Sequence, residues 1–108
     1  MSARRASRPF KETSKELLKD PVTAAMYLEE MLADGDIEMF KVALKDVAAA
    51  RVGNMSALAS ETNLAREALY RSLSRKGNPR LDTLTKVLHA AGLRLSVAPV
   101  VAGHLSEK

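Results

Sequence analysis

The sequence predicts an all-α domain of five helices, followed by a single β-strand. Two observations indicate this fold class. Apolar residues recur at three- and four-residue intervals through most of residues 17–92, which is the spacing of half-buried helices. The pattern then changes at residue 93, where apolar Leu93, Leu95 and Val97 alternate with other residues, as in a half-buried strand.

Capping residues mark the first two helices, over residues 21–34 and 37–51. Asp20 and Pro21 open the first helix, because Asp accepts hydrogen bonds from free amides and Pro lacks a donor that would be unpaired there. Gly35 ends that helix and Asp36 caps the next one. The residues expected inside are Ala25, Leu28, Met31 and Leu32 in the first helix and Phe40, Ala43, Leu44 and Val47 in the second.

Three shorter helices follow. The third covers residues 55–61, and the fourth runs from about 66 to 75, where the Gly and Pro of "KGNP" prevent it from continuing. The fifth covers residues 81–91 and closes at Gly92. We expect it to bury Leu84, Val87 and Leu88.

The 108 residues are enough for one domain with its own core. Residues 1–16 read as a basic, flexible arm, residues 17–92 as the helical domain, residues 93–100 as a dimerisation strand and residues 101–108 as a tail. A lone strand leaves backbone groups unpaired. We therefore expect the strand with Leu93, Leu95 and Val97 to pair with the same strand of a second copy, which makes a homodimer.

Charge is distributed unevenly along the chain, whose net charge is +4. Residues 21–50 carry two basic and six acidic groups, whereas residues 51–80 carry six basic and two acidic groups. This asymmetry predicts one surface for a polyanion such as DNA and another surface for a different partner. Ordinary solvated helix faces are the alternative.

Residues 55–76 have the features of a helix-turn-helix. Close crossing of its two helices needs a small residue, and Ala59 provides it between Leu58 and Thr62. The turn needs a residue that tolerates positive φ, and Asn63 qualifies. Leu64 then enters the core, and Leu69 and Leu73 continue its inward stripe.

The outward face of the second helix of this pair predicts base recognition in the major groove. Its residues are Arg66, Glu67, Tyr70 and Arg71. Arginine can donate two bonds to guanine, and glutamate can accept one from the amino group of cytosine. Four more polar residues at the helix exit are expected beside the duplex backbone: Arg75, Lys76, Asn78 and Arg80. The alternative is an ordinary exposed face, on which Arg66 pairs with Tyr70 and Glu67 forms a surface salt bridge with Arg71.

Ala65 stands where a capping hydroxyl is usual, before the second helix of the pair. Alanine there costs on the order of 1 kcal/mol relative to serine or threonine. A DNA phosphate could take the place of the cap, because the start of a helix attracts anions. We therefore include Ala65 among the expected DNA contacts.

The run of residues 17–98 resembles the addiction-module antidote proteins, the HigA-like antitoxins of type II toxin–antitoxin pairs. The motifs that carry the resemblance are "LKDP", "AAMYLEEMLADGD", "MSALA", "REALYRSLS", "GNP" and "LDTLTKVLHAAGLRLSV". These proteins belong to the Xre/lambda-repressor-like helix-turn-helix group. The resemblance departs from the family pattern at Asn63, where Gly is usual, and at Ala65, where Ser is usual.

The resemblance implies a five-helix domain that binds the double-stranded operator DNA of its own operon as a dimer and represses transcription. It also implies neutralisation of a co-encoded RelE/ParE-like toxin, a small basic protein of ribonuclease type. Ser56 becomes a phosphate contact, beside the recognition face already named. A basic toxin would be attracted to the acidic residues of the first two helices, of which we name Glu29, Glu30, Asp34 and Glu38. The N-terminal arm is the rival toxin site.

We expect no catalytic residue, no metal site, no cofactor, no small-molecule ligand and no enzymatic activity. His89 lies among apolar neighbours on a helix and His104 in the tail, and we find neither a metal-ligand constellation around them nor a cysteine or a glycine-rich phosphate loop. No apolar run is long enough to cross a membrane, so we expect a cytoplasmic protein. Two other functions fit the sequence: a stand-alone Xre-type regulator without a toxin, and a helical adaptor that binds protein but not DNA.

Overall fold

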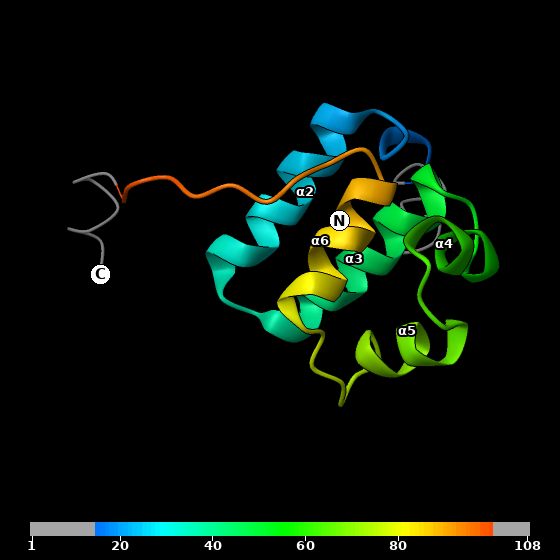
Figure 1. The fold of residues 1–108 in the computed structure, drawn as a ribbon. Helices are drawn as coiled ribbons and strands as arrows, with labels where there is room; N and C mark the ends of the chain where they lie inside the picture. Colours follow the sequence, from blue (N-terminus) through cyan, green and yellow to red (C-terminus); the bar gives the residue numbers. More distant parts are fainter. Residues whose placement is uncertain (1–14, 101–108) are drawn as a thin grey trace, which may run out of the picture.

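The computed structural model describes residues 15–100 (Figure 1). Within them a helical turn at residues 15–17 precedes five helices. These are α2 (Pro21–Asp34), α3 (Ile37–Arg51), α4 (Met55–Thr62), α5 (Arg66–Ser72) and α6 (Leu81–Ala90). The predicted all-α class is therefore confirmed for this part of the chain. The N-terminal arm, apart from residues 15 and 16, and the tail lie outside the described residues.

The caps predicted for the first two helices are present. The Asp20 carboxylate accepts hydrogen bonds from the backbone N–H and the hydroxyl of Thr23, both at 2.9 Å. These bonds hold the pKa of Asp20 below its usual value of 3.8. Gly35 ends α2 with a φ of 77°, and Asp36 accepts from the N–H of Met39 at 3.1 Å. The sharp α2–α3 connection is thus specified locally.

Helix α3 supplies the largest part of the core. Phe40, Ala43, Leu44 and Val47 are buried along one face of it, as predicted. Helix α2 packs on α3, helix α6 packs on both α3 and α4, and α5 packs on α4. Val87 and Leu88 of α6 are also buried, and Leu84 is half-buried, so this helix presents the expected face to the core.

The inward face predicted for α2 was wrong in part. Leu28 is buried, but the second fully buried residue of α2 is Ala24, while Ala25 and Met31 are only half-buried. Leu32 is 45% exposed. Apolar residues surround almost the whole of α2, so their spacing did not single out one face, and contact with α3 selected it.

The strand predicted at residues 93–100 is absent from the described residues. Leu93 donates its N–H to the carbonyl of Leu88 at 2.8 Å and packs against the core. The rest of the segment runs past α2 and away from the helices (Figure 1), and Val97 is 99% exposed. The correction has a simple cause: within the described chain this extended segment has no second strand with which to form a ladder.

Candidate nucleic-acid interface

Helices α4 and α5 are joined by a three-residue break whose geometry follows from its residues. Asn54 caps α4 by accepting a hydrogen bond from the N–H of Ala57 at 2.8 Å. Asn63 ends α4 with a φ of 60° and a ψ of 31°, the left-handed conformation expected for it. Leu64 packs against the core. The break therefore has the predicted turn residue and the predicted core contact.

Helix α4 braces α5 through a packed, uncharged contact. Leu58 and Leu69 are buried, and Ala59 is half-buried against the core. Thr62 is also buried, and its hydroxyl donates to the carbonyl of Leu58 at 2.7 Å, so it brings no unpaired polar group into the core. This contact fixes the direction in which the other face of α5 points.

The outward face of α5 consists of the four residues predicted for base recognition, which are all exposed: Arg66, Glu67, Tyr70 and Arg71. The guanidinium of Arg66 lies 5.9 Å from the centre of the Tyr70 ring. Its Nη1 also donates to Oγ of Ser56 at 3.0 Å. Two predicted DNA contacts from different helices are thus adjacent across the break.

Of the two surface pairs in the alternative interpretation of this face, Arg66 with Tyr70 is formed, whereas Glu67 with Arg71 is not. The ion pairs among residues 15–100 join other groups: Lys19 with Glu16, Arg75 with Glu38, and Arg80 with Asp82. The Glu67 and Arg71 side chains on the outer face of α5 are therefore available to another molecule.

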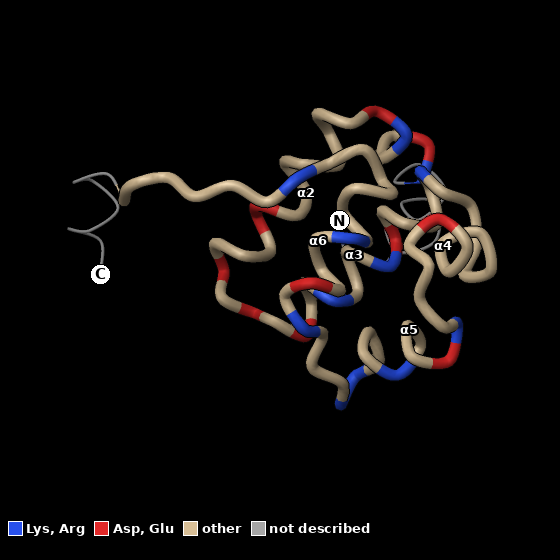
Figure 2. The backbone as a smooth tube through the Cα atoms, viewed as in Figure 1, with Lys and Arg blue, Asp and Glu red and all other residues tan. Residues whose placement is uncertain are grey.

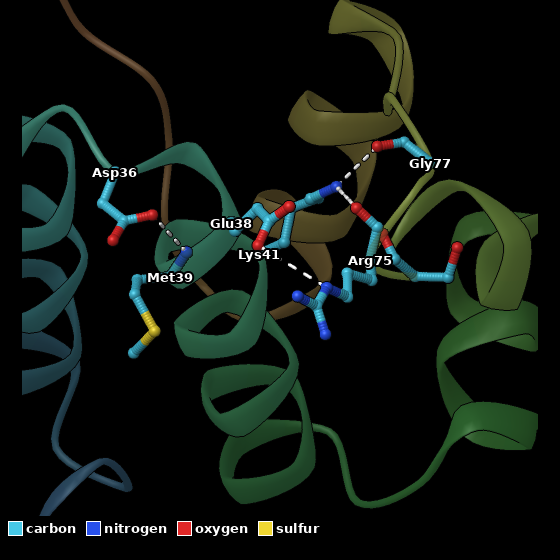
Figure 3. A network of polar contacts seen from close by, with 7 residues as sticks. Asp36, Glu38, Met39, Lys41, Arg75 and Gly77 are labelled. Carbon is cyan, nitrogen blue, oxygen red and sulfur yellow. Dashed lines mark hydrogen bonds and ion pairs between the residues drawn. The ribbon is translucent and has the colours of Figure 1, made fainter.

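The residues at the α5 exit are exposed, and two of them meet carboxylates. Nε of Arg75 lies 3.8 Å from Oε1 of Glu38 (Figure 3), and Nε of Arg80 lies 3.4 Å from Oδ1 of Asp82. Exposed pairs of this kind are worth only about 0.2–1 kcal/mol, so a phosphate can compete for either arginine. Lys76 and Asn78 are exposed beside them.

Ala65 occupies the N-cap of α5, as predicted, with no side-chain hydrogen bond to the helix. Its φ of −67° and ψ of 136° are the extended geometry of a normal N-cap, and Leu69 donates its N–H to the Ala65 carbonyl at 3.0 Å. The backbone is thus shaped for a cap, and what the helix lacks is only the capping oxygen.

The acidic residues named for toxin contact divide between two places. Glu29, Glu30 and Asp34 are exposed on α2, whereas Glu38 lies on the first turn of α3, against Arg75. Figure 2 shows the acidic groups along α2 and the following turn, and the basic groups along α5. The acidic and basic segments of the sequence therefore lie on different helices of the fold.

Sequence reasoning missed two features. Lys41, on the core-facing side of α3, is buried, and its position between Phe40 and Leu44 in the apolar stripe was the available signal. Val22 and Met26 are 64% and 62% exposed on α2, four residues apart and on one face. Glu29 and Glu30, three and four residues after Met26, lie beside this face and were the available signal of its exposure.

The described residues contain no cluster of three or more His, Asp or Glu side chains that could hold a metal ion. Over the same residues, no helix is both long and apolar enough to span a membrane.

The fold and this surface define a small helical domain with exposed arginines on α5 and acidic residues on a separate helix, α2. A family model described as "Probable addiction module antidote protein" matches residues 9–99, and the chain belongs to this family. It is also 43% identical over 72 residues to an uncharacterized protein of Haemophilus influenzae, which covers 67% of this chain and 72% of that protein. No solved structure matches the chain significantly. Membership of an antidote family indicates an antitoxin role and a toxin partner of some kind, and such families are generally not enzymatic.

Proposed function

We propose that the protein is an antitoxin of the HigA-like, Xre-type helix-turn-helix group, which represses its own operon by binding operator DNA and neutralises a RelE/ParE-like toxin. The observation that carries the DNA-binding half is the exposed face of α5. Two arginines there, Arg66 beside the Tyr70 ring and Arg71, are exposed and have no ion-pair partner among the described residues. Family membership supports the toxin-binding half.

In this proposal α4 and α5 form a helix-turn-helix, and the N-terminal part of α5 enters the major groove. Arg66 and Arg71 donate to guanine edges, and Glu67 accepts from a cytosine amino group. The Tyr70 ring lies against a thymine methyl or donates its hydroxyl to a phosphate. The remaining contacts position the protein on the backbone: Ser56, Ala65 through the amides after it, Arg75, Lys76, Asn78 and Arg80.

We place the toxin on α2. This helix carries Glu29, Glu30 and Asp34 but no basic residue, and these carboxylates form no ion pair within residues 15–100. The exposed Val22 and Met26 lie on the same helix. Apolar side chains with acidic neighbours fit a basic protein that presents apolar residues of its own. Glu38 is acidic like these residues, but it lies on α3, where it pairs with Arg75 at the α5 exit.

A dimer would pair the segments that contain Leu93, Leu95 and Val97. Extended backbone without a ladder partner, together with the exposed Val97, supports pairing with a second copy. Two copies would present two α5 faces, which suits a palindromic operator with half-sites about 34 Å apart or a multiple of that spacing.

Duplex binding tests the DNA half. The wild type should shift a DNA fragment from upstream of its own gene, and the logarithm of its affinity should fall against the logarithm of salt concentration with a slope of about 0.9 per phosphate contact. Replacing both Arg66 and Arg71 with alanine should abolish the preference for that fragment. The matched control is Lys86→Ala, an exposed lysine on α6, which should bind normally. A wild-type affinity that does not respond to salt would refute DNA binding and favour the protein-binding adaptor.

Co-purification with the product of the neighbouring reading frame tests the toxin half. Glu29→Lys combined with Glu30→Lys should release a basic toxin, whereas Glu61→Lys, on the exposed surface of α4, should retain it. If no adjacent frame encodes a small basic protein, the stand-alone regulator replaces the antitoxin as the better proposal.

A further inference from the structure

The buried Lys41 makes an unusual set of hydrogen bonds. This residue of α3 is only 4% exposed. Its Nζ donates to the carbonyl oxygens of Ser74 and Arg75, both at 2.9 Å, and to that of Gly77 at 2.6 Å (Figure 3). An ammonium group has three donors and no acceptor. All three donors are therefore used on one short stretch of backbone, residues 74–77, which we name the exit turn.

The exit turn is folded tightly against the end of α5. The N–H of Gly77 donates to the carbonyl of Ser74 at 3.0 Å, which closes the turn. A Cβ atom on Gly77 would lie 2.0 Å from the carbonyl oxygen of Arg71, so no other residue fits there unless the backbone moves. Hydrogen bonds from Lys41 therefore hold the carbonyls of the turn, and close contact with α5 leaves room only for glycine at position 77.

The geometry points to Lys41 as the residue that positions the exit turn for DNA, an inference that rests on the proposed DNA-binding function. The carbonyls of the turn are directed to the Lys41 ammonium, while the side chains of Arg75 and Lys76 are exposed. A turn that is fixed before binding has less conformational freedom to lose when its side chains meet phosphates. Lys41 itself is buried and contributes through the turn.

The same arrangement links α3 to the α5 exit through a second contact. Glu38, one turn before Lys41, pairs with Arg75. That pair is exposed and weak, whereas Lys41 is itself buried and makes three hydrogen bonds that are partly shielded from solvent. Lys41 rather than Glu38 is therefore the residue that holds the backbone of the turn.

The test compares Lys41→Met with Lys45→Met. Methionine keeps most of the unbranched stem of lysine and removes the three donors. Lys45 lies one turn further along α3, is exposed, and loses the same charge when it is replaced. Lys41→Met should weaken binding to the upstream DNA duplex about tenfold and lower the salt slope by about 1.8, the value for two lost phosphate contacts. Lys45→Met should change the slope by less than half as much.

Amide hydrogen exchange gives a readout that does not depend on DNA. In Lys41→Met the Gly77 amide should exchange faster, while the amide of Val47 in the core stays protected. Unchanged Gly77 protection together with a wild-type salt slope would overturn the inference. If the wild type binds no duplex at all, the DNA-binding proposal fails, and Gly77 exchange alone decides whether Lys41 holds the turn.

A second variant serves if Lys41→Met does not fold. Gly77→Ala keeps the ammonium and every charge, but its Cβ forces the turn away from α5. It should lower the salt slope as Lys41→Met does. A folded Gly77→Ala protein with wild-type affinity and slope would show that the position of the turn does not matter, which contradicts the inference.

Discussion

Replacing Ala65 with serine tests how α5 begins. The backbone at this N-cap is extended, with a φ of −67° and a ψ of 136°, and Ala65 is exposed, so a serine fits without strain. Its hydroxyl would accept a hydrogen bond from the N–H of Glu67 or Ala68, neither of which can have a partner within the helix.

The gain can be estimated from capping energies. A serine in place of alanine at an N-cap adds about 1 kcal/mol to the free energy of unfolding, with a range of about 0.5–2 kcal/mol. For a domain of this size, 1 kcal/mol corresponds to a rise of about 4–8 °C in Tm. Thermal unfolding followed by circular dichroism at 222 nm measures this shift.

The reverse change on α4 is the control. Asn54 already caps α4 through its bond to Ala57, so Asn54→Ala should lower Tm by a similar amount. An unchanged Tm for Ala65→Ser, beside the expected fall for Asn54→Ala, would refute the view that α5 lacks only a capping oxygen.

Duplex binding by Ala65→Ser gives the second result. If a phosphate takes the place of the cap, the new hydroxyl competes with it for the same amides, and affinity for the upstream DNA should fall. Tighter binding would count against a phosphate at this position and would leave the stability prediction standing.

Three further predictions concern stability. Asn63→Ala should cost about 1 kcal/mol, because alanine is strained at a φ of 60°, whereas Asn63→Gly should keep the wild-type Tm. Burial raises the pKa of Tyr27 above 10.0, and the charge and hydrogen bond of Asp46 add to this. Because folding favours the neutral phenol, Tyr27 contributes fully to the free energy of unfolding below pH 10, and this contribution is lost as pH rises through the folded pKa. Urea unfolding between pH 7 and 11 should therefore show a fall in the free energy of unfolding that Tyr27→Phe lacks. The lowered pKa of Asp20 acts in the opposite direction. Asp20 contributes to the free energy of unfolding above pH 3.8, and this contribution is lost as pH falls through the folded pKa. The stability of Asp20→Asn, measured between pH 6 and 2, should therefore depend less on acid than that of the wild type.

The helices themselves could be predicted because the signals that start and stop them are local. Asp20, Asp36 and Asn54 each cap a helix by accepting from the residue three positions further on. Asn63 takes the left-handed conformation that its side chain tolerates. The outward face of α5 followed from the same periodicity, because Leu69 faces the core and leaves Tyr70 and Arg71 outside.

The early end of α5 was not predictable from these signals. The sequence predicted a helix to residue 75, but the helix ends at Ser72 and the exit turn begins at Ser74. Lys41 is 33 to 36 positions away from the carbonyls that it bonds. Only the packing of α3 beside this end of α5 brings the ammonium to the turn, so residues 66–80 supply the glycine that the turn needs but not the group that bonds its carbonyls.

Contacts between distant segments also decided the two corrected predictions. Helix α2 buries Ala24 and Leu28 because α3 lies against that side, although its sequence offered several apolar faces. Residues 93–100 alternate like a strand, yet a strand requires a partner, and the described chain provides none. The sequence by itself therefore determined where helices begin and which turns can form, since those depend on neighbours within four residues. The tertiary structure decided which faces are buried, where α5 stops and how Lys41 is used, because these depend on residues that meet only after the chain has folded.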